Sequence, residues 1–174
     1  MLNRIEILEA SVEDGHDLTR VEIESKTKSI PEVVSPVEID FPLRLQRWTN
    51  YLTGASLPTA ARPERIVFKA CIGQRMVGFI AGHLTTRYGK EAEIQSFFVL
   101  PENQRAGLGG RLLLQFIEWA TRHNTKSLCV GIAASNKYKA FYLKYGGQYI
   151  NPHWIYWDDM QALAQNITQH SISL

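Results

Sequence analysis

The sequence has few of the features that would indicate a metal, a disulfide framework or a membrane. Only two of its 174 residues are cysteine, Cys71 and Cys129, and they lie far apart in apolar, strand-like runs. This pattern matches neither a metal site nor a disulfide framework, so we interpret both as reduced core residues of a cytoplasmic protein. No apolar run approaches the roughly 20 residues of a membrane helix. The first ten residues, MLNRIEILEA, carry charges among their apolar residues, unlike a signal peptide.

An excess of charge of one sign is also missing. The chain has 19 basic and 17 acidic side chains and a formal net charge of +2. That value is too small to indicate a nucleic-acid or membrane partner. A content of 45% hydrophobic and 21% charged residues is typical of a soluble globular protein. With no internal repeat, low-complexity segment or linker, the sequence predicts one domain over residues 1–174. Its core spans about residues 4–158. Residues 159–174 are a polar tail for which the sequence predicts no particular structure.

Hydrophobic periodicity and turn residues predict the order β-α-α-β-β-β-α-β-α-β-β. The expected strands are residues 4–9, 65–72, 76–86, 91–100, 127–132, 149–150 and 154–157. Four helices are expected. Two span residues 11–26 and 107–123, a further one begins after a cap at Asp40, and the last begins after a cap at Ser135 or Asn136 and runs to Tyr145. Residues 53–64 are the clearest loop. Three strands in succession, followed by alternation, indicate a mixed α/β sheet with helices on its faces.

The stretch Ile94–Leu114 reads as a buried strand, a glycine-rich loop and the start of a helix. Glycines allow close backbone approach, and a helix start presents free N–H groups, so this arrangement can bind an anion. An ordinary turn is the other interpretation. The Lys-Ser/Thr pair of a nucleotide-binding P-loop does not follow Gly109. A dinucleotide fold would place such a loop after its first strand, whereas this one follows three strands in succession.

Two motifs resemble the GNAT superfamily of acyl-CoA-dependent N-acetyltransferases. Residues 104–109, QRAGLG, fit its Q/R-x-x-G-x-G/A loop. Residues 136–147, NKYKAFYLKYGG, resemble its N-x-x-A-x-x-F-Y-x-x-x-G-F motif, with shorter spacing between Ala140 and Phe141 and with Gly147 in place of phenylalanine. The resemblance implies a central, mostly antiparallel sheet of about seven strands with helices on both faces. It does not reach residues 29–64 in any specific way.

The resemblance implies acetyl-CoA as co-substrate, a primary amine as acceptor, and direct attack in a ternary complex without a metal. The coenzyme A pyrophosphate would lie on the loop's N–H groups, and the pantetheine arm would pair with the strand before the loop. The implied cofactor-binding residues are Phe98, Val99, Leu100, Gln104, Arg105, Ala106, Gly107, Leu108, Gly109, Gly110, Arg111 and Asn136. For Arg105 and Arg111 a solvated surface charge is equally consistent, and Asn136 can be a plain helix cap.

Two residues are candidates for the chemistry. Tyr142 matches the family tyrosine that protonates the leaving thiolate, a role that suits a phenol because its pKa is near 10. Glu93 stands where some family members carry a general base, and a carboxylate inside a sheet is expected to have a raised pKa. The alternatives are a core aromatic for Tyr142 and a solvent-facing strand residue for Glu93. His83 and Asp158 are reserve bases.

Two further readings stay open. The first is a non-catalytic module of the same fold that binds or senses acyl-CoA. The second is a homodimer, with Trp154, Tyr156 and Trp157 at its edge. The acceptor pocket is expected in residues 29–60 and the turn at residues 87–89, whose mixed composition leaves peptide, polyamine, aminoglycoside and amino-acid acceptors open.

Overall fold

A computed structural model describes residues 4–133 and 136–172, and seven strands form one sheet in it. The order across the sheet is β1-β2-β3-β4-β5-β7-β6. The strands are β1 (Ile5–Glu9), β2 (Ala61–Ile72), β3 (Arg75–Thr85), β4 (Ala92–Val99), β5 (Leu128–Gly131), β6 (Gln148–Asn151) and β7 (Trp154–Trp157). Only β4 and β5 pair in parallel, and every other neighbouring pair is antiparallel. The predicted mixed, mostly antiparallel sheet is confirmed.

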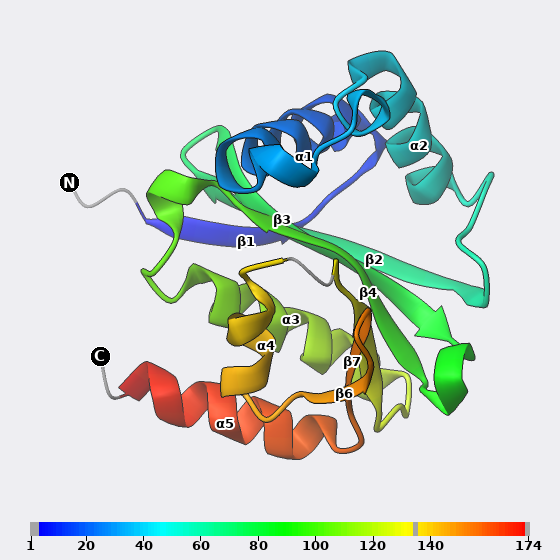
Figure 1. The fold of residues 1–174 in the computed structure, drawn as a ribbon, viewed down its shortest axis with the longest axis vertical. Coiled ribbons are helices and arrows are strands. Elements are labelled where there is room, and N and C mark those ends of the chain that lie inside the picture. The colour runs from blue at the N-terminus through cyan, green and yellow to red at the C-terminus, as the bar shows by residue number, and fades with distance from the viewer. Residues whose placement is uncertain (1–3, 134–135, 173–174) are drawn as a thin grey trace.

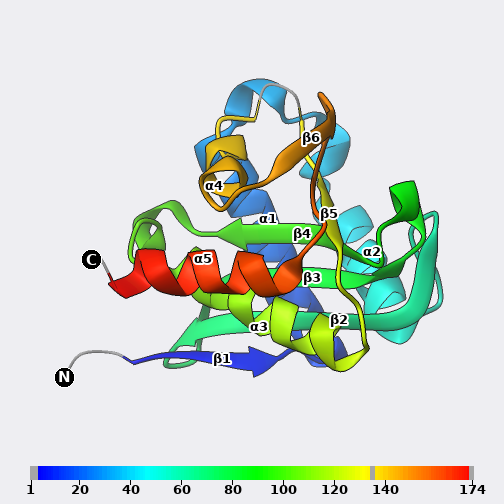
Figure 2. The same ribbon diagram turned by 90° about the horizontal axis from the view of Figure 1, so that it is seen from below.

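Helices cover both faces of this sheet. They are α1 (Gly15–Ser29), α2 (Phe41–Thr53), α3 (Leu108–Arg122), α4 (Lys139–Lys144) and α5 (Met160–Ile172). Figures 1 and 2 show α1 and α2 on one face and α3 and α5 on the other. None of the helices described in residues 4–133 and 136–172 is long and apolar enough to cross a membrane.

Residues 160–172, in the tail whose structure the sequence left open, form α5 and extend the core. Met160, Leu163 and Ile167 are buried at helical spacing, and α5 packs on α3. This apolar stripe is narrow and polar residues separate its members, so the tail reads as polar when taken as a whole. β2 also begins earlier than predicted, at Ala61. The register shifts between Ala61 and Arg65, and this irregularity accommodates Pro63.

The packing of α3 on the sheet depends on a glycine. The buried side of α3 consists of Leu108, Leu112, Leu113, Phe116, Ile117 and Ala120. A Cβ atom added at Gly82 of β3 would lie 2.3 Å from the Phe116 ring. The ring therefore sits directly against the backbone of β3, and α3 approaches the centre of the sheet closely.

The aromatic residues proposed for a dimer edge do not lie at an edge. Strand β7, which carries Trp154, Tyr156 and Trp157, runs between β5 and β6. Trp157 is buried, and its indole N–H donates to the Tyr145 carbonyl at 3.1 Å. The free edges of the sheet are β1 and β6, because the chain inserts its last strand inside the sheet.

The junction of β1 and α1 is held by Asp14. The Ser11 backbone N–H donates to Asp14 Oδ2 at 2.8 Å, which confirms the predicted helix start, and Lys69 Nζ on β2 lies 2.7 Å from Oδ1. Burial raises the pKa of Asp14, but Lys69 and the donors of Ser11 outweigh it, and the net pKa lies below the usual value.

Asp14→Asn is expected to lower the free energy of unfolding by about 1 kcal/mol at pH 7. Because the pKa of Asp14 is depressed in the folded state, its contribution is present above the unfolded pKa of about 3.9 and is lost as the pH falls through the folded value. Urea unfolding at pH 7 and pH 3 measures this. An equal difference between the variant and the wild type at both pH values would contradict the assignment.

Candidate active site

The sheet opens where β4 and β5 separate. The two strands pair at only three positions, Ala92 with Leu128, Glu93 with Cys129, and Ile94 with Val130. Strand β4 continues along β3 as far as Val99, whereas β5 ends at Gly131. The second half of β4 is therefore paired on its β3 side only, and backbone groups on its other side are available to a ligand.

Alternation along β4 decides which backbone groups face this open side. The Leu100 N–H donates to the Val77 carbonyl on β3 at 2.9 Å. In an antiparallel pair the groups of alternate residues point the same way, so Leu100 and Phe98 face β3. Phe97 and Val99 face the open side. Of the three strand residues in the predicted cofactor site, only Val99 has its backbone there. Phe97, whose backbone also faces the open side, was not among the predicted residues, although the alternation of residues along a strand could have indicated it.

Gln104 closes one end of this open edge. Its side-chain Nε2 donates to the Val99 carbonyl at 2.8 Å. This contact ties the glycine loop to β4, and it leaves the Val99 N–H as the neighbouring polar group on the open side.

The predicted glycine loop leads directly into α3. Gly107 has φ +76°, a left-handed conformation that glycine adopts without strain, and Arg105 has φ +63°. The first hydrogen bond at the helix start runs from Arg111 N to the Gly107 carbonyl at 3.1 Å. The N–H groups of Leu108, Gly109 and Gly110 precede that bond, as expected at a helix N-terminus. The loop thus has the geometry of an anion site.

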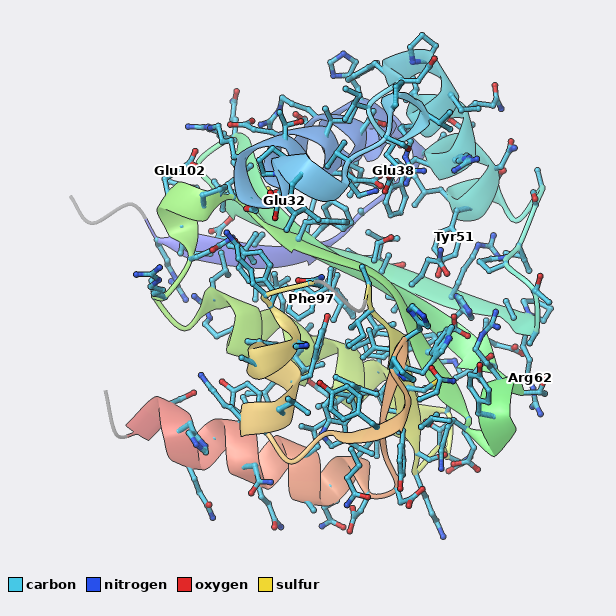
Figure 3. All side chains as sticks on the ribbon, viewed as in Figure 1. Glu32, Glu38, Tyr51, Arg62, Phe97 and Glu102 are labelled. Carbon is cyan, nitrogen blue, oxygen red and sulfur yellow. The ribbon has the colours of Figure 1, made fainter. Side chains whose placement is uncertain are left out.

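Two glycines of the loop lie close to side chains of α4 and α5. A Cβ atom at Gly109 would lie 3.1 Å from Cε2 of Phe141 on α4 and 3.8 Å from the Phe97 ring. The Phe97 and Phe141 rings meet edge to face at 5.5 Å, and Figure 3 shows the Phe97 side chain in the space between β4 and α4. A Cβ atom at Gly110 would lie 3.2 Å from Ile167 on α5. The loop, the open edge of β4 and α4 therefore meet at one place.

The two loop arginines and their neighbours differ in placement. Arg105 and Ala106 are exposed, and Leu108 is buried in the core. The Arg111 guanidinium donates to the Ile5 carbonyl on β1 at 3.2 Å. Arg105 is thus free to approach an anion at the loop, and Arg111 is engaged with the opposite edge of the sheet.

Asn136 shapes the approach to α4. Its Oδ1 accepts a hydrogen bond from the Tyr138 N–H at 2.7 Å. This is a turn before the helix, and α4 itself begins at Lys139, later than predicted. Ser135, the other predicted cap, lies outside the described residues.

Tyr142 is buried in an aromatic cluster on the α5 face. Its ring lies 5.4 Å from that of Phe141 and 6.0 Å from that of Trp157, centroid to centroid. Burial raises the pKa of Tyr142 above its usual value, because the phenolate would lose its hydration. The phenol therefore remains protonated at neutral pH.

Glu93 is enclosed by polar partners on the α2 face of the sheet. It is 3% exposed, which rules out the solvent-facing alternative. Its Oε2 accepts from Arg87 Nε at 3.0 Å and from Thr85 Oγ1 at 3.1 Å, and His83 Nε2 lies 3.6 Å away.

The expectation of a raised pKa for Glu93 is wrong. Burial does raise the pKa of this carboxyl, but His83 and Arg87 outweigh that effect, and the net pKa lies below the usual value. Local sequence could not predict this, because β3 and the turn η4 (Arg87–Gly89) bring these two side chains beside Glu93 only after the sheet has formed.

The reserve bases differ in position. His83 is fully buried beside Glu93, and its Nδ1 lies 3.0 Å from the hydroxyl of Tyr51 on α2. The Asp158 side chain is 71% exposed and pairs with Lys90 at 2.6 Å. His83 therefore belongs to the Glu93 network, and Asp158 is a surface residue beyond β7.

The turn η4, one expected part of the acceptor pocket, packs on β7. The Arg87 guanidinium carbon lies 4.7 Å from the Trp154 ring, and the Tyr88 ring contacts the same indole at 5.4 Å. Arg87 thus connects the Glu93 carboxylate to an aromatic surface beside the point where β4 and β5 separate. Within residues 4–133 and 136–172, no group of three or more His, Cys, Asp or Glu side chains could hold a metal ion.

A known protein family matches this chain. A sequence profile described as the acetyltransferase (GNAT) family matches residues 28–146, more than half of the chain. The chain belongs to the GNAT family. The predicted family is thereby confirmed. A comparison with curated protein sequences finds no match.

Solved GNAT structures share the fold at low sequence identity. A PaiA N-acetyltransferase from Thermoplasma acidophilum, in complex with coenzyme A, has a TM-score of 0.71 and 20% identity, over 88% of this chain and 97% of that one. A GNAT acetyltransferase from Brucella melitensis in complex with acetyl-CoA has a TM-score of 0.60 and 16% identity, over 90% and 88%. The ribosomal-protein-S18-alanine N-acetyltransferase from Escherichia coli has a TM-score of 0.61 and 16% identity, over 88% and 91%.

Proposed function

We propose that this GNAT protein is an N-acetyltransferase that moves an acetyl group from acetyl-CoA to a primary amine by direct attack in a ternary complex. The observation that carries the proposal is the junction of the open β4 edge with the glycine loop and the N-terminus of α3. A pyrophosphate and an extended amide-containing arm need these two features side by side.

The pyrophosphate and the pantetheine arm of the cofactor each have matching groups. The pyrophosphate would accept hydrogen bonds from the N–H groups of residues 105–110, and Arg105 would add positive charge. The pantetheine amides would pair with backbone groups of Phe97 and Val99, much as an added strand would. The Thermoplasma and Brucella proteins of this fold hold coenzyme A and acetyl-CoA, respectively, which supports this choice of ligand.

The acid and base are assigned by chemistry. The Tyr142 phenol, kept neutral by burial, would donate its proton to the leaving thiolate. Glu93 would accept a proton from the amine. Its ion pair with Arg87 on η4 lowers its basicity, so its strength as a base depends on how closely Arg87 pairs with it.

Two measurements test the proposal. Titration calorimetry should show micromolar binding of acetyl-CoA, and a broad panel of amines should yield at least one acetylated product. The complete absence of acetyl-CoA binding would sink the proposal. Binding without product across the panel would favour the alternative, a non-catalytic acyl-CoA sensor of the same fold.

Gly109→Leu is expected to weaken acetyl-CoA binding at least 10-fold, because its side chain would occupy the space in front of Phe141 and Phe97 at the helix N-terminus. Calorimetry measures the dissociation constant, and thermal unfolding checks that the fold persists. Gln74→Leu, at an exposed position of the β2–β3 turn, is the control for placing a leucine on the surface. Unchanged affinity in the Gly109 variant would place the cofactor elsewhere.

A homodimer would use a free edge of the sheet, β1 or β6, rather than the aromatic residues of β7. Edge strands present unpaired backbone groups to a second copy. Sedimentation velocity tests this, and a single monomeric species at all concentrations would exclude it.

A further inference from the structure

We propose that Glu93, His83 and Tyr51 form a buried proton relay, which carries the surplus proton of the acceptor amine from β4 to a solvent-connected cavity beside α2. The inference rests on the proposed acetyl transfer. It assigns two relay residues, one of which, Tyr51, lies on a helix that no sequence motif singled out.

The reaction needs such a route because of its proton balance. At neutral pH a primary amine is mostly an ammonium, since its pKa is near that of lysine, about 10.4. Ammonium and acetyl thioester give amide, thiol and one free proton. Two N–H bonds of the ammonium break. Tyr142 protonates the thiolate and is itself re-protonated by the first of the two released protons. The second proton must reach water.

The three side chains are buried and lie next to one another. Glu93, His83 and Tyr51 are 3%, 0% and 6% exposed, so water does not reach them freely. The Tyr51 hydroxyl is 3.0 Å from His83 Nδ1, and His83 Nε2 is 3.6 Å from Glu93 Oε2. Figure 3 shows the Tyr51 side chain directed from α2 toward the sheet. Together they cross from the separation of β4 and β5 to the underside of α2.

His83 has an unused nitrogen in this line. Its Nε2 is buried and has no hydrogen-bond partner within the described residues. A buried polar atom without a partner is costly, so such an atom calls for an explanation. The gap to Glu93 is slightly too long for a hydrogen bond, but contacts of this kind often tighten when substrate binds. A protonated Glu93 would supply the missing donor.

The other end of the relay reaches a cavity. Tyr51, Leu52, Arg65, Glu9 and Glu64 line a space of about 270 Å³ between α2, β2 and the end of β1. Glu9 and Glu64 are exposed, so the cavity is connected to solvent. Tyr51 lines this cavity and its hydroxyl contacts His83, whereas Glu93 does not line it, so an outgoing proton would pass from Tyr51 to water there.

The transfer balances in three steps. An N–H bond of the ammonium breaks and an O–H bond forms on Glu93. The Glu93 proton then moves to His83 Nε2. His83 gives its Nδ1 proton to the Tyr51 oxygen as Tyr51 releases its own proton to water in the cavity. Every group returns to its starting charge, and no electron changes place. His83 ends as the Nε2–H tautomer, and rotation of its ring restores the Nδ1–H tautomer before the next turnover.

The charges around the relay agree with this exchange. Burial raises the pKa of Tyr51, so its phenol passes on a proton only as it receives another. Arg87 from η4 donates to Glu93, and Arg65 from β2 is the register partner of His83 on β3. Burial raises the pKa of the Cys129 thiol on β5 to about 12. The neighbouring thiol is therefore neutral and does not compete for the proton.

Tyr51→Phe tests the relay, because it removes the hydroxyl and keeps the ring in its edge contact with Trp48 at 6.0 Å. Single-turnover acetyl transfer should fall about 10-fold while acetyl-CoA affinity stays within two-fold of wild type. Rates in mixtures of H2O and D2O should show a curved dependence on deuterium for wild type, since several protons move, and a linear one for the variant. Tyr149→Phe, an exposed tyrosine on β6, is the matched control and should behave as wild type.

His83→Gln provides a second variant, with circular dichroism to verify folding, and should give the same loss. Transfer by wild type with unchanged rates in both variants would overturn the relay and leave the proposed function standing. A slower Tyr51→Phe that keeps the curved deuterium dependence would show a structural role only and would overturn it too. No transfer by wild type to any amine would overturn the proposed function and the relay together.

Discussion

Tyr142→Phe should lower the turnover number at least 100-fold and leave the acetyl-CoA dissociation constant within about two-fold of wild type. General acid catalysis contributes about 10²–10⁴-fold in rate, and phenylalanine has no proton to give to the thiolate. The ring keeps its edge contacts with Phe141 and Trp157, so the aromatic cluster should persist. Steady-state kinetics with calorimetry of cofactor binding measure the two quantities separately.

Tyr145→Phe is the control for this result. Tyr145 lies on the same end of α4, is also buried, and contacts Phe141 edge to face at 5.2 Å. Its hydroxyl lies near Gly110. Removing that hydroxyl should change the turnover number less than three-fold. Equal turnover in the Tyr142 variant and wild type would remove the acid role, and an equal loss in both variants would indicate a packing effect.

Glu22→Ala should lower the free energy of unfolding by about 3–5 kcal/mol. Glu22 on α1 is 1% exposed and accepts hydrogen bonds from Lys26 Nζ at 2.9 Å, from Trp48 Nε1 at 2.8 Å and from Arg44. It joins α1 to α2, and its loss would leave partly buried cations without their anion. Lys26 also lies 5.7 Å from the Phe98 ring on β4, so the same cluster supports the face that carries Glu93.

Glu24→Ala is the matched control. Glu24 is two residues further along α1 and pairs with Lys28 at 2.6 Å and Arg20 at 3.4 Å near the surface. Its removal should cost less than about 1 kcal/mol, as for other exposed ion pairs. Urea unfolding of both variants checks the difference. Similar losses in the two would mean that the Glu22 cluster does not join the helices.

Local pattern determined most of the architecture of this protein. The period-two strands, the glycine loop before α3 and the Gly-stopped α4 each depend on residues within a few positions of one another. That is the range over which backbone preference and periodicity act. The family motif and the loop's anion-binding geometry could therefore be predicted from sequence, and so could the burial of Phe116 and its neighbours on α3.

Tertiary structure alone decided the pKa direction of Glu93 and which strands form the free edges of the sheet. The pKa direction of Glu93 depends on His83 and Arg87, which reach it from β3 and η4, and the link to Tyr51 depends on how α2 lies over the sheet. The insertion of β7 inside the sheet moved the free edge to β6, and a narrow stripe of apolar residues made α5 part of the core. The spacing of residues in the sequence does not indicate which distant residues become neighbours, and the pKa of a buried group depends on those neighbours.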